Sequence, residues 1–189
     1  MNASWIDRTI SYDGSQLRAH WILAETGHAG DSIVAFRGPC RVLLDEIADL
    51  ADIDGPGIAA NDMVHFVWEC FDDANLTLAV HRQRLLSASA RETLAALAPH
   101  AMVRRDGDDL FLGDGKLSIS IATASPVSSL IHFAVNATHG GAPVQIAALS
   151  DLRVDPRRFA ESLLMRVVDE QASIRTARSK VRAKGEWQR

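Results

Sequence analysis

The sequence predicts a single α+β domain in which a mixed, largely antiparallel sheet is flanked by helices. Apolar residues recur at helical spacing in two long segments, one ending before Pro99 and one starting at Pro156. Between these segments, strict alternation of apolar and polar residues predicts strands. Helices and strands that are segregated along the chain, rather than alternating one by one, are typical of α+β proteins.

The length and composition fit one globular domain. The 189 residues are 47% hydrophobic and 23% charged, which is too apolar for a disordered chain. No Pro- or Gly-rich linker divides the sequence, and no apolar run approaches the roughly 20 residues of a membrane-spanning helix. The start of the chain lacks the pattern of a secretory signal, and two cysteines are too few for a disulfide framework. We therefore expect one cytoplasmic domain over residues 1–189, with no membrane partner.

The charge is distributed unevenly along the chain. A formal net charge of −4 argues against a general nucleic-acid binder. Residues 171–189 nevertheless carry a net charge of +5 and predict a basic helical tail, so the remaining chain carries −9. The simpler interpretation of the tail is a solvated helix end whose basic residues suit the negative pole of the helix dipole. RNA binding through the tail is the alternative.

The first part of the chain predicts a helix, a strand and an acidic segment. Asp13 or Ser15 is a suitable N-cap for a helix that Gly27 would end. Residues 31–37 alternate as a strand. Residues 42–50 are strongly acidic and fit a helix.

The middle of the chain predicts a loop, two strands and a long helix. The run 52–62 is rich in Gly, Pro and Asp, which is typical of a loop. Residues 62–71 alternate clearly, and 76–80 predict a short strand beside them. A helix then follows and ends at Pro99.

The last part of the chain predicts a compact set of strands and a final helix. Gly113 to Gly115 form a turn between two of the strands. Asp155 caps the final helix, with Pro156 at its first position. The predicted strands are 109–112, 116–122 and 130–137.

Polar side chains gather on one face of the last two predicted strands. In the strand 116–122, Leu117, Ile119 and Ile121 are expected to point into the core, so the alternate residues share the opposite face. Short side chains beside one lysine leave room for a ligand, and a lysine suits phosphate or carboxylate oxygens. An ordinary solvent-facing sheet surface is the alternative. If the strands 116–122 and 130–137 pair with each other, their polar faces form one surface. Its residues are Lys116, Ser118, Ser120, His132 and Asn136.

Other polar residues could join this face only through folding. Arg37 closes a strand before a Gly-Pro turn, and His20 lies on the first predicted helix. His65 and Glu69 share one face of a strand but lie about 13 Å apart at about 3.3 Å per residue, so no metal site is predicted. The glycine-rich motifs of dinucleotide-binding, P-loop and serine hydrolase sites are absent from the sequence.

Four segments resemble a family described as domain of unknown function 366. They follow one another in the family's order and span most of the chain, and the resemblance implies no established activity. These segments are YDGSQLRAHW (12–21), GDSIVAFRG (30–38), NDMVHFVWE (61–69) and RRDGDDLFLGDGKLSISIATASPVSSLIHFAVN (104–136).

A more distant resemblance is to the biotin and lipoate protein ligases, whose fold also underlies class II aminoacyl-tRNA synthetase catalytic domains. It rests on DDLFLGDGKLSIS (108–120) followed by SLIHFAVN (129–136). The resemblance implies that Lys116 contacts the acyl carbonyl and phosphate of an acyl-adenylate, and it matches Asn136 to an asparagine that ends the following strand. The chain lacks two glycine features of these ligases. One is the glycine pair expected near residues 59–66, and the other is the glycine expected three residues after the lysine. No cysteine follows Lys116, so a thioacyl-enzyme is not expected.

Together these observations predict an enzyme of the ligase or acyltransferase type. It would bind a carboxylate- or nucleotide-like small molecule on the sheet face, with ATP as a possible cofactor. The alternative is a non-catalytic ligand-binding or assembly protein, and an exposed strand edge could support a homodimer. Lys116, His65 and Asp62 are the predicted catalytic residues. The predicted ligand-binding residues are His20, Arg37, Ser118, Ser120, Ser125, His132 and Asn136.

Overall fold

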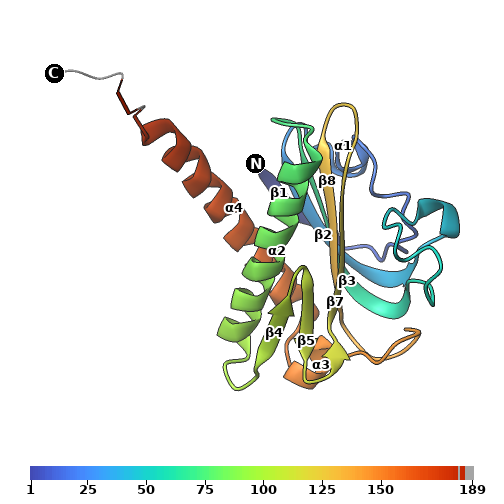
Figure 1. Cartoon of the computed structure of the whole chain (residues 1–189). Coiled ribbons are helices and arrows are strands. Elements are labelled where there is room, and N and C mark those ends of the chain that lie inside the picture. The colour runs from blue at the N-terminus through green and yellow to red at the C-terminus, as the bar shows by residue number, and fades with distance from the viewer. Residues whose placement is uncertain (183, 186–189) are drawn as a thin grey trace.

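The chain forms a five-stranded mixed sheet with two long helices on one face (Figure 1). The computed structural model describes residues 1–182 and 184–185. The strands of the large sheet follow the order β1-β2-β3-β8-β7, and a small sheet has the order β4-β5-β6. The strands are β1 (Asn2–Trp5), β2 (Ser32–Arg41), β3 (Ala59–Cys70), β4 (Val103–Asp106), β5 (Asp109–Leu112), β6 (Gly115–Lys116), β7 (Ser118–Ala124) and β8 (Ser129–Asn136). The helices are α1 (Trp21–Thr26), the 3-10 turn η1 (Leu44–Glu46), α2 (Leu76–Leu97), α3 (Leu149–Leu152) and α4 (Pro156–Lys180).

The predicted mixed sheet is confirmed. The edge strand β1 pairs in parallel with β2, whereas β2, β3, β8 and β7 pair antiparallel with one another. Antiparallel neighbours need only short connections, and the 125–128 turn between β7 and β8 is one of them.

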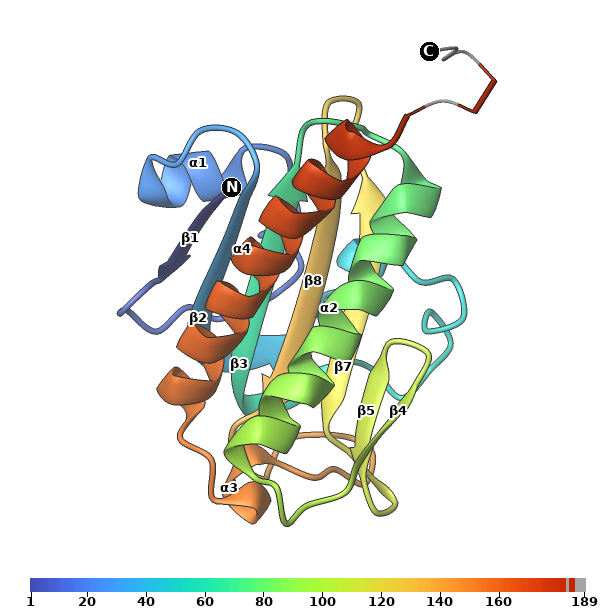
Figure 2. The ribbon, with the colours of Figure 1, turned by 90° about the vertical axis from the view of Figure 1, so that its left-hand side faces the viewer.

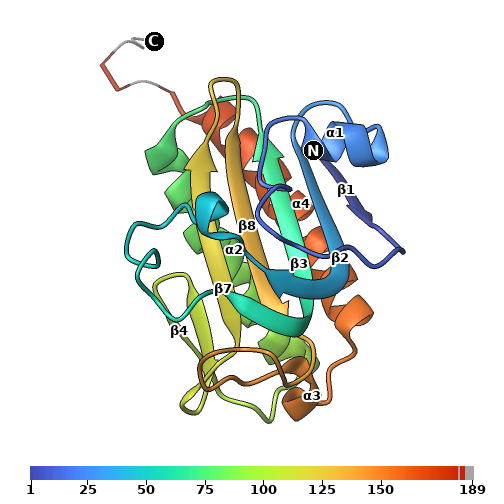
Figure 3. The same ribbon diagram turned by 90° about the vertical axis from the view of Figure 1, so that its right-hand side faces the viewer.

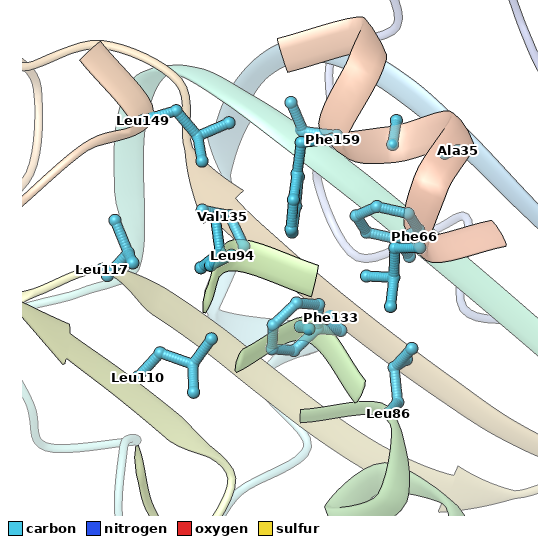
Figure 4. Packing of buried hydrophobic residues seen from close by; sticks show 14 of the residues in the cluster. Ala35, Phe66, Leu86, Leu94, Leu110, Leu117, Phe133, Val135, Leu149 and Phe159 are labelled. Carbon is cyan, nitrogen blue, oxygen red and sulfur yellow. The ribbon is translucent and has the colours of Figure 1, made fainter. Parts of the chain in front are cut away.

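The two faces of the sheet are covered differently. Helices α2 and α4 lie side by side across one face (Figure 2) and enclose the larger core. Phe66 of the sheet packs there against Phe133 of β8 and Phe159 of α4 (Figure 4). The opposite face carries no long helix; loop segments and α1 cover it instead (Figure 3), and Tyr12 and Ile22 belong to a second, smaller core on that side.

Several predicted element ends are confirmed. Gly27 closes α1 in the left-handed conformation, and its N–H donates to the carbonyl of Leu23. Asp155 caps α4 by accepting a hydrogen bond from the N–H of Arg158, with Pro156 as the first helical residue. Along the described residues, no helix combines the length and apolarity needed to cross a membrane.

The two expected helices in the first part of the chain are much shorter than predicted. Residues 13–16 form a turn, in which the Asp13 carboxylate accepts from the Ser15 N–H and hydroxyl, so α1 begins only at Trp21. Within 42–50 only η1 is helical. Val42 donates its N–H to the carbonyl of Ile58 instead, which draws the start of this segment into strand-like pairing.

Three strand predictions also need correction. Residues 76–80 are the first turns of α2, because the Asn75 side chain caps them by accepting from the Leu78 N–H. The strand β3 begins at Ala59, inside the expected loop 52–62, because Ala59 and Ala60 pair with the end of β2. The expected strand 116–122 is divided at Leu117 into β6 and β7. The edge strand β1 was not predicted.

The predicted basic tail lies only partly in the described structure. Helix α4 carries it as far as Lys180, and Figure 1 shows this end of the helix projecting beyond the sheet. Arg175 of this projecting part pairs with Asp31. Glu186 and Arg189 of the tail lie outside the described residues.

Candidate functional site

A cavity of about 400 Å³ lies on the sheet face opposite α2 and α4, the face that Figure 3 turns toward the viewer; its lining residues place it there. Segment 46–60 forms one wall, and residues 142–146 form another. Strand β7 contributes Ile119 and Ile121, and β8 contributes His132 at the floor. Apolar walls with a few polar groups are typical of small-molecule sites.

Lys116 lines this cavity at the point where β6 lies between β5 and the 145–147 segment. Its N–H donates to the carbonyl of Gln145, and its Nζ lies 2.8 Å from an Asp109 carboxylate oxygen. Burial raises the pKa of Asp109, and the hydrogen bond from Lys116 opposes that shift. Lys116 therefore sits in the cavity as half of an ion pair and keeps about a third of its side chain exposed.

Asn136 holds the backbone around Lys116. Its side-chain amide donates to the carbonyl of Lys116 at 3.1 Å and to that of Ala147 at 3.0 Å. These two bonds join β6 to the segment that forms a cavity wall. Asn136 therefore positions Lys116, although it also borders the cavity.

Carboxylates dominate the charge of the cavity lining. Lys116 is the single cationic side chain among the lining residues that the structure describes. Arg18 pairs with Glu46, and Arg84 pairs with Asp108 at 2.6 Å, so cations outside the lining neutralise two of these acids. An anionic ligand group would therefore be attracted to one place in the cavity, the Lys116 ammonium. The lining carboxylates are Glu46, Asp49, Asp52, Asp108 and Asp109.

Two predicted histidines meet beneath the cavity. His65 Nδ1 lies 3.1 Å from His132 Nε2, and His65 Nε2 lies 3.1 Å from the carbonyl oxygen of Gly38. Tyr12 stacks on His132 with ring centroids 3.7 Å apart. Burial lowers the pKa of His65 to about 4, and burial with the neighbouring His65 lowers that of His132. Both rings are therefore neutral at pH 7.

The predicted orientation of Ser118 and Ser120 is wrong. In the register of β7 and β8, Ser118 lies opposite Val135 and Ser120 opposite Phe133, both of which face the helices. The Ser118 hydroxyl accepts from the Leu110 N–H, and the Ser120 hydroxyl donates to the His132 carbonyl. These hydroxyls therefore do not share the cavity with Lys116, although both residues border it.

The division of the strand at Leu117 causes this reversal. The Leu117 N–H donates to Leu110, and its carbonyl accepts from Asn136, so Leu117 itself enters the helix-side core. The alternation restarts after it, which turns Ile119 and Ile121 toward the cavity instead of the core.

Arg37 and Asp62 lie on the helix side of the sheet, outside the cavity lining. They share a face with Val64, which lies opposite Arg37 and belongs to the larger core. Arg37 forms two hydrogen bonds of 2.7 and 2.8 Å with Asp62, and Thr138 donates a third. The Arg37 guanidinium lowers the pKa of Asp62. This pair joins β2 to β3, and the structure does not bring it together with Lys116 in the cavity.

His20 and Ser125 lie at the other end of the sheet, around the buried Glu69. The His20 N–H donates to the Glu69 carboxylate at 3.0 Å, and Ser128 donates to the same group at 2.7 Å. Ser125 is engaged in the 125–128 turn. Neither residue lines the cavity, so the structure does not bring them together with Lys116.

One further cluster has ligand-type atoms near this end of the sheet. Single atoms of Asp31, Cys70 and Asp72 lie within 4.8 Å of one another. Arg175 and Arg82 pair with the two carboxylates, and burial raises the pKa of the Cys70 thiol to about 12. The two carboxylates are therefore used in ion pairs with arginines, and we assign the cluster a structural role.

The sequence interpretation did not single out two residues of the cavity, Tyr12 and Asp109. Tyr12 is the only tyrosine in the chain, and an aromatic residue between two turn-forming segments could have signalled a docking role. In the sequence Asp109 appears only as the first residue of the predicted strand 109–112. Its pairing with Lys116 depends on the hairpin of β5 and β6, which sets the residues close together across the turn.

The close approach of Gly38 to Ile10 gives a stability prediction. A Cβ at position 38 would lie 2.0 Å from the Ile10 carbonyl oxygen, and three backbone hydrogen bonds with β2 hold the 10–12 segment there. We expect Gly38→Ala to lower the free energy of unfolding by about 1–3 kcal/mol through this overpacking. It should also displace Tyr12 from the histidine pair.

Chemical denaturation of both proteins checks this, with Gly55→Ala as the control. Gly55 is exposed, also lacks a left-handed backbone, and its Cβ would meet no atom closer than 3.0 Å. Equal losses in the two variants would contradict the steric explanation.

The mixed sheet and its helix-covered face resemble the fold of the biotin protein ligases. A biotin protein ligase from Aquifex aeolicus in complex with biotin and ATP superposes with a TM-score of 0.62 at 11% identity, covering 92% of this chain and 72% of that one. The Leishmania major biotin protein ligase in complex with biotinyl-5-AMP gives 0.59 at 10% identity, covering 100% and 87%.

The chain belongs to the family described as Domain of unknown function (DUF366), whose model matches residues 1–182. A Pyrococcus horikoshi protein of unknown function has the same structure, with a TM-score of 0.90 and 38% identity over 96% of this chain and 98% of that one. The uncharacterized protein MJ0805 of Methanocaldococcus jannaschii is 34% identical over 160 residues, which cover 82% of this chain and 72% of the relative. The predicted family and fold are confirmed.

Proposed function

We propose that this protein is an enzyme of the ligase or acyltransferase type that binds a small carboxylate- or nucleotide-like molecule in the cavity. The observation that carries the proposal is the place of Lys116, the cationic side chain of an otherwise acidic and apolar lining. An ammonium group held there can stabilise negative charge that develops on an acyl oxygen or a phosphate. The fold supports this class by analogy alone.

The pairing of Lys116 with Asp109 suggests how an anion would be received. A carboxylate or phosphate that enters the cavity competes with Asp109 for the ammonium group. Burial raises the pKa of Asp109 and the Lys116 hydrogen bond lowers it, so the loss of that bond as Lys116 turns to the ligand would favour the protonated form of Asp109. Protonation removes the repulsion between Asp109 and the ligand, and Asn136 keeps the Lys116 backbone in place.

Adenylation is the reaction that the structural neighbours favour. One of them is described with biotin and ATP, and another with biotinyl-5-AMP. For this chain we propose ATP as the cofactor and an unidentified carboxylate as the acyl donor. The chemistry would join the carboxylate oxygen to the α-phosphorus of ATP, with pyrophosphate as the leaving group and Lys116 beside the oxygens that gain charge.

Lys116→Ala tests this proposal. ATP at saturating concentration should raise the melting temperature of the wild-type chain, because a ligand that binds only the folded state stabilises it. The variant should lose most of that shift and about 100-fold or more of the pyrophosphate release seen with an adenylatable carboxylate, as expected for removal of one charge-stabilising group. Lys180→Ala, on the exposed end of α4, is the matched control and should behave as wild type. The absence of any ATP effect on the wild-type chain would overturn adenylation.

A non-catalytic ligand-binding protein is the second candidate, favoured by the neutralisation of Lys116 in the ion pair with Asp109. In that case biotin, lipoate or octanoate would stabilise the chain in a thermal-shift screen without pyrophosphate release in the presence of ATP. The cytoplasmic location, the lack of a nucleic-acid or membrane partner and the homodimer stay predictions.

A further inference from the structure

A buried hydrogen-bond chain runs from the backbone to the cavity floor. It connects the carbonyl of Gly38 with His65 and then with His132, through contacts of 3.1 Å each. His65 has no exposed surface and His132 is only 2% exposed. The two rings come from the neighbouring strands β3 and β8 and point to the same side of the sheet.

The Gly38 carbonyl, at one end of this series of hydrogen bonds, determines which ring nitrogens of His65 and His132 carry a hydrogen. A carbonyl oxygen only accepts, so His65 Nε2 must carry the hydrogen. Burial keeps His65 neutral, so its Nδ1 is an acceptor and His132 Nε2 must donate to it. Burial also keeps His132 neutral, which leaves its own Nδ1 without a hydrogen.

His132 Nδ1 is the one polar ring atom left to face an occupant of the cavity. Across the described residues no hydrogen bond reaches it, yet it is not among the fully enclosed polar atoms that lack a partner, which are Ser4 Oγ and Trp68 Nε1. The atom therefore still borders open space, and His132 lines the cavity. Tyr12 lies parallel to the ring, with an interplanar angle of 6°, and so fixes its plane.

We propose that the cavity floor selects a ligand whose inner end presents an N–H or O–H donor to His132 Nδ1. The inference rests on the proposed function, because it assigns the ligand's acidic end to Lys116. Asn136, four residues beyond His132, bonds to the Lys116 carbonyl, so the backbone of Lys116 is held near a point roughly 13 Å from His132 along β8 at about 3.3 Å per residue. The ligand class is an elongated molecule with an acid at one end and a neutral hydrogen-bond donor at the other.

Recognition at His132 can be tested with a pair of isosteric probes on the full chain. Indole carries one N–H donor, and benzofuran has a ring oxygen in its place. Indole should bind at least fivefold more tightly, although benzofuran is the more apolar molecule. In protein labelled with ¹⁵N-histidine, both buried rings should show the neutral Nε2–H form at pH 7, and indole should shift the His132 Nδ1 signal while benzofuran leaves it in place.

His132→Phe keeps a ring for Tyr12 to stack on and removes Nδ1, so it should abolish the preference for indole. The exposed control His81→Asn should keep it. If the Phe variant fails to fold, the wild-type spectra decide the question. A His132 ring protonated at Nδ1, equal affinities for the two probes, or no binding of either would overturn the inference.

The two proposals fail separately. A wild-type chain that prefers indole but shows no response to ATP would overturn adenylation and leave donor selection standing. A chain that releases pyrophosphate but binds benzofuran as tightly as indole would overturn donor selection alone.

Discussion

Lowering the pH from about 6.5 to about 4 is expected to reduce the free energy of unfolding by on the order of 3 kcal/mol through His65 alone. In this range the imidazole takes a proton in the unfolded chain, where its pKa is 6.5, but stays neutral in the folded chain, where its pKa is about 4. The unfolded state therefore binds more protons, so stability falls as the pH falls. His132, whose pKa is also lowered, contributes in the same direction.

The carboxylates with a lowered pKa cannot produce this effect. Asp13, Asp62 and Asp151 have an unfolded pKa of 3.8, so their contribution to stability is lost only as the pH falls below that value. Asp109, whose pKa is raised by burial, takes up its proton first in the folded state and therefore opposes the histidine effect as the pH falls, so comparison with histidine variants is needed to separate the two.

Urea denaturation at several pH values measures the effect. The double variant His65→Phe and His132→Phe should flatten the dependence in this interval, because it removes both titrating rings and leaves no charge to bury. Replacing the exposed His81 by Asn should leave the dependence as in the wild type. A double variant that keeps the full slope would show that other groups cause it.

Truncation of Phe66 should lower the free energy of unfolding by about 3–5 kcal/mol, the range for a large aromatic residue in a core. Its side chain has no exposed surface, and its ring centroid lies 5.9 Å from Phe159 edge to face and 6.1 Å from Phe133 (Figure 4). Phe66→Ala therefore removes contacts that join the middle of the sheet to α4 and leaves a void that three elements cannot readily close.

The matched control is Leu44→Ala on the 3-10 turn η1, where the leucine is 73% exposed. We expect that change to stay within about 0.5 kcal/mol. Because Phe66 faces the helices and the cavity lies on the opposite face, Phe66→Ala should preserve probe binding at temperatures where the variant is folded. A loss below about 1 kcal/mol would show that the core collapses around the site.

The strand alternation predicted faces correctly only where the pairing is regular. In 62–71 and 130–137 both partners are continuous, so Phe66 and Phe133 point to the helices, and His65 and His132 to the other side. At Leu117 one irregular residue shifts the alternation, and every later side chain in that strand changes face. No local pattern in the sequence reports this irregularity, because it depends on bonds from Leu117 to Leu110 and Asn136.

The structure brings some of the predicted site residues together at one cavity and places others elsewhere. Lys116, His132 and Asn136 border one cavity because β6, β8 and the 142–147 segment meet there. Arg37 and Asp62 were assigned to the site from their position at strand ends, but their parity places them on the other face. His20 and Ser125 lie near the far end of the sheet, around Glu69, and the chain alone does not show which ends of its strands are adjacent.

The sequence by itself determined the family and the α+β class. It also determined the N-cap of α4 and the face of the sheet on which each histidine lies, because these depend on neighbours a few residues apart. Only the tertiary structure decided that His65 and His132 are in contact and that Asp109 forms an ion pair with Lys116. It also decided that the hydroxyls of Ser118 and Ser120 point away from the cavity. Those outcomes depend on which strands pair and in what register, and register is set by packing of the whole sheet.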